Sequence, residues 1–216
     1  MAGRGIFEIA IELQEVRPTV LRRAQVPADT TLAGLHDVVQ VATGWTDSHL
    51  HEFDVDGVCY GSPDSDGDRD DVVDDATVTL SCLLEQGSRL DYDYDFGDGW
   101  RHRLTVEKVL AAEPGVSYPR CVSGQLACPP EDVGGPWGYD EFVVAMTDLD
   151  HPEHPRFREW VGGPFDPAAA FDLDAVNQAP TGGGFRGQNG GGSVAGSWGA
   201  AGVGFGGSGG AGGSGP

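Results

Sequence analysis

The residues of this sequence that could bind a metal ion are histidines, cysteines and one aspartate. They are His49, His51, Asp95, His102, Cys121 and Cys128. Imidazole nitrogen, carboxylate oxygen and thiolate sulfur are the usual ligands of zinc and related divalent cations. The motif HLHEF places His49 and His51 on one face of a strand, where two imidazoles can share a cation. The sequence does not predict a particular cofactor. Zinc or another divalent metal is the candidate ligand for these residues.

The two cysteines of CVSGQLAC are a weak zinc signal. Cys121 and Cys128 are separated by six residues and have no second pair, whereas a structural zinc site usually combines four ligands in closely spaced pairs. Packed or surface thiols are the favoured interpretation. Four cysteines in the whole chain are too few for a disulfide scaffold in a domain of this size. We therefore expect reduced thiols in a cytoplasmic protein.

A second set of residues could contact a protein partner. These candidates are Asp98, Trp100, Glu131, Asp132, Trp137 and Tyr139, on the turn at 96–100 and the loop at 129–139. In CPPEDVGGPWGY the prolines fix the backbone, the glycines permit a tight turn, and the acidic pair can accept amide hydrogen bonds. The stretch therefore predicts a rigid loop of defined shape, whose acidic pair can also face a partner.

The motif DYDYDFGDGWRH predicts a β-hairpin with acidic residues at its turn. Asp95, Asp98 and His102 could bind a hard cation or transfer protons. If Phe96 pairs with Trp100, however, Asp95 faces Arg101 in a ladder of opposite charges, which is the favoured interpretation.

The remaining pattern places these residues in an α+β domain. Alternation predicts strands at 6–13 and 20–27, which form a hairpin, and a third strand over 49–61 with a turn at Asp56-Gly57. Between them, helical spacing predicts a helix that is capped by Asp29 or Thr30 and ends at Gly44. Short helices follow near Tyr139, at 154–163 and from Pro167. We expect a single domain of antiparallel hairpins packed with a few helices, with a β-grasp-like N-terminal half.

Composition separates a folded part, residues 4–178, from a Gly-rich low-complexity tail, residues 179–216, which we expect to be disordered. The folded part carries 12 basic and 34 acidic residues, a formal charge of −22. This acidity disfavours binding to nucleic acid, which needs Lys and Arg to displace counterions. The sequence has no apolar run of membrane-spanning length and no signal-peptide pattern at its N-terminus, so we expect a cytoplasmic protein without membrane contact.

Five motifs occur in the order of a known family. They are VLRRAQVPADTTLAGLHDVVQVATGW, HLHEF, YDYDFGDGWRH, YPRCVSGQLACPPEDVGGPWGYDEF and FDLDAVN. Over residues 6–178 the sequence resembles the plasmid pRiA open-reading-frame-three-like family, whose members are also labelled insertion-element passenger proteins of a TnpR type. The resemblance implies an association with plasmids and other mobile elements.

The function expected from these observations is that of an acidic accessory module that binds an unidentified protein partner and is not an enzyme. The alternative is a metal-binding domain or metal-dependent enzyme. Resolvase-like DNA recombination ranks last, because the chain is acidic and has no recognisable helix-turn-helix. Residues 4–178 also lack the GxSxG, P-loop and GxGxxG motifs of serine hydrolases, nucleotide hydrolases and dinucleotide enzymes.

Overall fold

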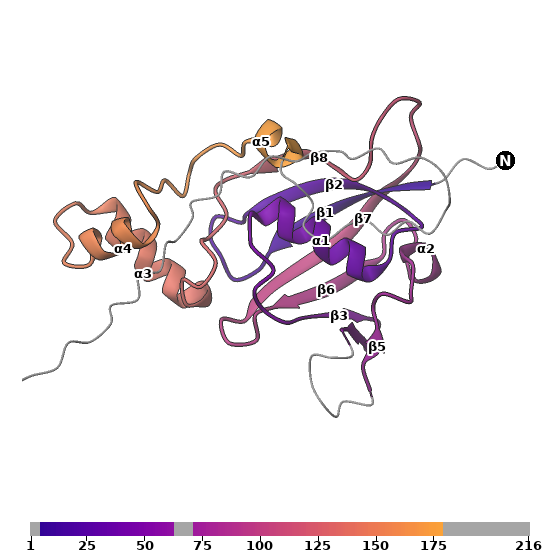
Figure 1. The fold of residues 1–216 in the computed structure, drawn as a ribbon, viewed down its shortest axis with the longest axis horizontal. Helices are drawn as coiled ribbons and strands as arrows, with labels where there is room; N and C mark the ends of the chain where they lie inside the picture. Colours follow the sequence, from indigo (N-terminus) through magenta and orange to yellow (C-terminus); the bar gives the residue numbers. More distant parts are fainter. Residues whose placement is uncertain (1–4, 63–70, 179–216) are drawn as a thin grey trace, which may run out of the picture.

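A computed structural model describes residues 5–62 and 71–178 of the chain. Within these ranges, eight strands form one sheet and five helices lie around it (Figure 1). The strands are β1 (Gly5–Leu13), β2 (Leu21–Pro27), β3 (His51–Val55), β4 (Val58–Gly61), β5 (Val73–Asp74), β6 (Arg89–Tyr94), β7 (Trp100–Ala111) and β8 (Arg120–Gln125). The helices are α1 (Leu32–Thr43), α2 (Leu80–Leu83), α3 (Gly135–Thr147), α4 (His154–Trp160) and α5 (Leu173–Gln178).

The sheet has the strand order β5-β4-β3-β6-β7-β1-β2-β8. Every neighbouring pair is antiparallel except β4 and β5. The predicted α+β class, with antiparallel hairpins and few helices, is therefore confirmed. The predicted disordered tail lies outside the described residues.

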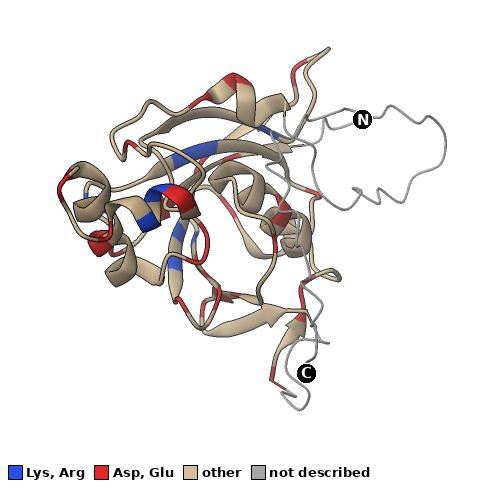
Figure 2. Ribbon diagram, turned by 60° about the vertical axis from the view of Figure 1, so that its left-hand side comes forward, with Lys and Arg blue, Asp and Glu red and all other residues tan. Residues whose placement is uncertain are grey.

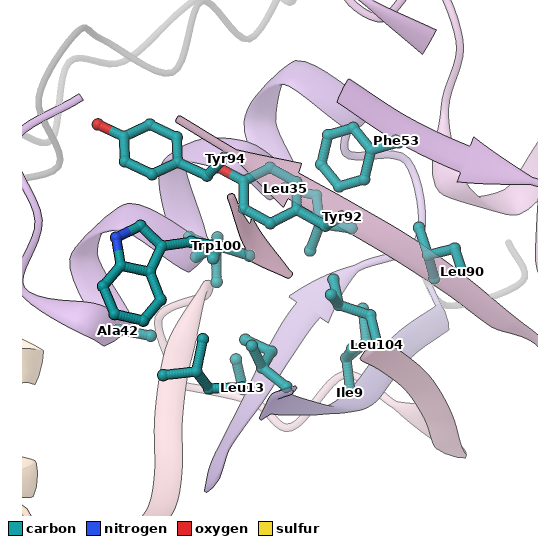
Figure 3. Close-up of a cluster of buried hydrophobic side chains, with 14 of the residues drawn as sticks. Ile9, Leu13, Leu35, Ala42, Phe53, Leu90, Tyr92, Tyr94, Trp100 and Leu104 are labelled. Atoms are coloured by element: carbon teal, nitrogen blue, oxygen red, sulfur yellow. The ribbon is translucent and has the colours of Figure 1, made fainter. Parts of the chain in front are cut away.

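Helix α1 covers one face of the sheet and closes the core. Its buried positions Leu32, Leu35, Val39 and Ala42 follow the helical period that the sequence shows. They face large side chains from the central strands, and Figure 3 shows this cluster, in which Tyr92, Tyr94 and Trp100 of the β6–β7 hairpin are fully buried. Burying each such ring contributes up to about 3 kcal/mol, so this hairpin is a major part of the core.

The ends of α1 agree with the prediction to within one residue. The N-cap is Thr31, and not Asp29 or Thr30. The Thr31 hydroxyl accepts a hydrogen bond from the amide of Gly34 at 3.1 Å. Gly44 ends the helix in the left-handed conformation with φ 81°, as expected.

The β6–β7 hairpin has a longer turn than the sequence suggested. Tyr94 pairs with Trp100, so five residues, 95–99, form the connection, and the predicted pairing of Phe96 with Trp100 is wrong. The cause is Asp95, whose Oδ1 accepts the amides of Gly97 and Asp98 at 3.0 and 3.3 Å and closes a wider loop.

The error is two residues, an even number, so the side chains of the paired strands keep their predicted faces of the sheet, whereas Asp95 and Phe96 lie in the turn. The ladder of opposite charges is present in the shifted register. Asp93 lies opposite Arg101 with 3.5 Å between their charged atoms, and Asp91 lies opposite Arg103 at 3.0 Å.

Two helices begin at residues that differ from the prediction. Helix α3 starts at Gly135, before the predicted Tyr139 or Asp140, because Gly134 takes a left-handed conformation with φ 96° directly ahead of it. Helix α5 starts at Leu173, after the predicted Pro167. Asp166 starts a single turn, in which its carbonyl accepts a hydrogen bond from the amide of Ala169. The chain does not continue this turn into a helix.

Figure 2 shows acidic residues spread over the loops and helix ends, with basic residues mainly on the strands and one short helix. Within the described residues, none of the helices is both long and apolar enough to cross a membrane.

Candidate metal centre

Three segments that are distant in sequence meet at one end of the sheet. They are the link 45–50 after α1, the β6–β7 turn 95–99 and the loop 129–134 before α3. The Trp45 indole donates to the carbonyl of Pro129 at 2.9 Å, and the amide of Asp95 donates to the carbonyl of Leu50 at 2.9 Å. The third side of the junction is closed by the amide of Gly134, which donates to Asp98 Oδ2 at 3.0 Å.

His49, Asp95 and Asp132 converge where these segments meet. His49 Nε2 lies 2.7 Å from Asp132 Oδ1 and 3.6 Å from Asp95 Oδ2. One ligand atom from each of the three residues lies within 4.8 Å of the other two. In the part of the chain that the structure describes, no other three His, Cys, Asp or Glu side chains converge in this way.

The spacing of these atoms fits a cation. Ligand atoms about 2.0–2.2 Å from one zinc-sized ion are about 3–3.5 Å apart from each other in tetrahedral or octahedral geometry. The distances of 2.7 and 3.6 Å bracket this value. Small movements of the Asp132 side chain, which is 61% exposed, would complete the fit.

The backbone is unusual at both aspartates. Asp95 has φ 53° and Asp132 has φ 63°, the left-handed region that few residues other than glycine adopt, although aspartate tolerates it best. Asp95 uses Oδ1 for the turn amides and keeps Oδ2 for His49. Unusual backbone conformations concentrate at binding sites, and here two of them present the carboxylates.

Electrostatics favour a positive charge at this point. Partial burial by itself would lower the pKa of His49, but the hydrogen bond to Asp132 and the charge of Asp95 outweigh it, and the pKa is raised. A hydrogen on His49 Nε2, directed at Asp132, would lie where a divalent cation would bind, and metal binding would release it.

The acidic pair of the loop is divided between two roles. Asp132 points to His49, whereas Glu131 is turned inward and hydrogen-bonded. Glu131 Oε2 accepts from the amide and the hydroxyl of Thr46 at 2.9 and 2.6 Å, and Oε1 accepts from the hydroxyl of Tyr94. Neither Tyr94 nor Thr46 was a candidate from the sequence, because only the fold places them beside Glu131.

The glycines of this loop are required by close backbone contacts. A Cβ on Gly135 would lie 2.1 Å from the carbonyl oxygen of Asp98, and one on Gly138 would lie 2.1 Å from that of Val133. The tight turn predicted from these glycines is present at Gly134 and Gly135, and Gly138 also allows a close backbone approach.

The structure places Cys121 and Cys128 elsewhere. Both lie near the buried guanidinium of Arg22, which donates to four backbone carbonyls and stacks on Phe171 at 4.2 Å. Burial raises the pKa of Cys121 to about 11 and of Cys128 to about 12, although Arg22 acts in the opposite direction. Protonated thiols beside a fixed positive charge are poor ligands for a second cation.

The other two histidine candidates have separate surroundings. His51 Nε2 lies 2.8 Å from Asp75 Oδ2, and its ring stacks on His36. His102 is fully buried against Trp45, and neither of its ring nitrogens has a hydrogen-bond partner among the described residues.

The partner-contact candidates divide between core and surface. Trp100 and Tyr139 are buried, at 0% and 4% exposure. The Asp98 carboxylate accepts a hydrogen bond from the amide of Gly134. Trp137 is 84% exposed on the first turn of α3.

Comparisons with known proteins agree on the family. Residues 5–175 match the family of plasmid pRiA4b ORF-3-like proteins, and the chain belongs to this family. It is 40% identical over 176 residues to the uncharacterized protein y4hQ of Sinorhizobium fredii, covering 81% of this chain and 90% of that protein. A crystal structure of MM3350, a protein of unknown function from Methanosarcina mazei Go1, shares the fold with a TM-score of 0.73 and 33% identity, over 80% of this chain and 97% of the other.

Proposed function

We propose that this protein is a divalent-cation-binding domain whose ligands are His49, Asp95 and Asp132. The observation that supports the proposal is the convergence of three ligand atoms from three separate segments within 4.8 Å. One imidazole and two carboxylates are a ligand set that Zn²⁺, Mn²⁺, Fe²⁺ and Co²⁺ accept. Ca²⁺ usually takes six to eight oxygen ligands and fits this set less well.

The site would leave coordination positions open. Three protein ligands leave one position in a tetrahedral ion and three in an octahedral one, as at catalytic metal sites. A water molecule bound there would have its pKa lowered, which is the basis of metal-assisted hydrolysis. Metal-dependent catalysis is therefore the form of enzyme activity compatible with this proposal.

Calorimetric titration of chelator-treated protein with Mn²⁺ and with Zn²⁺ tests the proposal. We expect about one equivalent bound by the wild type, and an affinity at least about 10-fold lower in Asp132→Asn, which removes the charge but keeps the shape. Asp140→Asn is the matched control, because Asp140 is an exposed aspartate on α3 outside the ligand set. Absence of binding by the wild type, or equal binding by both variants, would overturn the proposal.

A second candidate function is protein binding through α3. Trp137 is 84% exposed, and Val144, two turns later on the same helix, is 56% exposed. Exposed aromatic residues are frequent anchors of protein interfaces. Loss of a purified partner's binding in Trp137→Ala, with an unchanged melting temperature, would support this candidate. Unchanged affinity would remove it.

The wider assignments are part of the proposal. The insertion-element passenger label and the mobile-element association come from the family resemblance, and a cytoplasmic location follows from the composition. The comparison of the N-terminal half with a β-grasp is supported by its hairpin–helix–strand order. DNA recombination ranks last, because the charge opposes phosphate binding.

A further inference from the structure

One buried hydroxyl is hydrogen-bonded to two of the three segments that carry the candidate ligands, and its own residue directly precedes the third. Tyr94 Oη accepts hydrogen bonds from the amides of Ser48 and His49, at 2.9 and 3.2 Å. It donates its own hydrogen to Glu131 Oε1. A phenol has one donor and two acceptor positions, so the hydroxyl is fully used.

Each of these bonds ends at or beside a ligand. His49 is itself bonded through its amide. Asp95 is the residue after Tyr94, and Asp132 is the residue after Glu131. The Tyr94 hydroxyl therefore ties the backbone at His49 and the side chain next to Asp132 to the strand end that Asp95 continues, and it does not contact the ligand atoms.

We propose that Tyr94 is the positioning residue of the metal centre, and that its hydroxyl sets the spacing of His49, Asp95 and Asp132. This inference rests on the proposed cation-binding function. It assigns a role to a residue on a buried strand face, where a tyrosine would otherwise count only as core.

The anchor is rigid, which a positioning role requires. The Tyr94 ring is fully buried and stacks on Trp45 with 5.3 Å between centroids, while the His49 ring meets its edge at 5.8 Å. Figure 3 shows the hydroxyl at the margin of the core cluster, pointing away from the other labelled side chains.

Glu131 connects the loop that precedes α3 to the Tyr94 hydroxyl and to the link 45–50. Its Oε1 accepts from Tyr94 and its Oε2 accepts from Thr46, three residues before His49. The loop that presents Asp132 is thus tied to the link that presents His49 through one carboxylate. Groups that orient metal ligands typically change metal affinity by 10- to 100-fold when they are removed.

The chain provides a matched control in Tyr92. Tyr92 lies on the same strand, is equally buried, and has a hydroxyl bonded to His36 at 2.7 Å and to Gln40 at 3.0 Å. Tyr92→Phe and Tyr94→Phe therefore remove the same atom from the same core. The Tyr92 hydroxyl makes no hydrogen bond to a ligand or to a residue adjacent to one.

The experiment is calorimetric titration of the metal-free full chain with Mn²⁺ and Zn²⁺, for the wild type, Tyr94→Phe and Tyr92→Phe. We expect Kd to rise by about 10- to 100-fold in Tyr94→Phe and to change by less than about 3-fold in Tyr92→Phe. If Tyr94→Phe fails to fold, Glu131→Gln, which keeps the size of the side chain, is expected to raise Kd by at least about 10-fold.

The outcomes separate this inference from the proposed function. Absence of binding by the wild type overturns the cation-binding function and the positioning role together. Binding by the wild type with equal affinity in folded Tyr94→Phe overturns the positioning role alone. An equal loss in both tyrosine variants also overturns it, because general softening of the core would then explain the effect.

Discussion

His36 and His51 stack face to face, with ring centroids 3.6 Å apart and 10° between the ring planes. Each ring has a carboxylate at its Nε2, Asp47 for His36 and Asp75 for His51, both at 2.8 Å. Two imidazolium ions at this separation would repel each other, so the pair is built for at most one positive charge.

The surroundings of His36 favour its neutral form. The Tyr92 hydroxyl accepts from Gln40 Nε2 at 3.0 Å and lies 2.7 Å from His36 Nδ1, so it can donate its own hydrogen to this nitrogen. In that tautomer His36 Nδ1 is the acceptor and Nε2 carries the proton toward Asp47. Burial, and then the neighbouring His51, lower the pKa of His36 to about 4.

The first prediction concerns pH. Between pH 6.5 and 4 the unfolded chain binds a proton at His36 that the folded protein does not, so stability falls as the pH falls through this window. The contribution is up to about 3 kcal/mol. Asp37, whose pKa burial raises to about 6, acts in the opposite direction, so the difference between variants is the quantity to measure. Urea unfolding from pH 7 to pH 4.5 should show a shallower loss in His36→Gln than in the wild type, and parallel curves would contradict the assignment.

The second prediction concerns His102. Burial lowers its pKa to about 3, and the backbone of Tyr92 acts in the opposite direction. Among the described residues, neither ring nitrogen has a hydrogen-bond partner. An unpaired buried polar group costs about 1–3 kcal/mol. We expect His102→Leu to match or exceed the wild-type free energy of unfolding at pH 7, with a larger advantage at pH 5. A loss of more than about 2 kcal/mol would show that the ring has a polar partner.

The third prediction concerns the glycine pair. Gly135→Ala places a Cβ against the Asp98 carbonyl and forces an alanine to φ 67°, so we expect a cost of about 2–3 kcal/mol and weaker metal binding. Gly163→Ala is the control, since a Cβ there meets nothing within 4 Å and φ is ordinary. Thermal melting of both variants checks this, and equal melting temperatures would contradict it.

The fourth prediction separates the cysteines from the site. The double variant Cys121→Ala/Cys128→Ala should keep Mn²⁺ affinity within about 3-fold of the wild type, because these thiols lie beside Arg22 and not beside His49. A loss of at least about 10-fold would place the cation at the cysteines.

The fifth prediction concerns stabilisation by the metal. A ligand that binds only the folded state at 100 times its Kd adds about 2.7 kcal/mol to the free energy of unfolding. Mn²⁺ at 100 times the wild-type Kd should raise the melting temperature of the wild type clearly more than that of Asp132→Asn, which at a 10-fold higher Kd gains at most about 1.4 kcal/mol. An equal rise in both proteins would indicate binding at another site.

Local patterns predicted the elements well and their ends less well. Alternation predicted the β1–β2 hairpin, and helical spacing predicted α1 with its stop at Gly44. The β6–β7 turn was two residues too short in the prediction, because the side chain of Asp95 closes the loop and strand propensity does not report this. The even shift still left the side chains of the paired strands on their predicted faces.

The sequence by itself determined the family, the α+β class and the residue types that can bind a cation. These follow from periodicity, turn residues and ordered motifs, which are local properties of the chain. Only the tertiary structure decided which candidates meet: it joined Asp132, a candidate for partner contact, to His49 and Asp95, and left the cysteines beside Arg22. The physical reason is that a ligand set depends on distances between atoms on separate segments. These distances are fixed by strand order and by buried hydrogen bonds such as those of Tyr94.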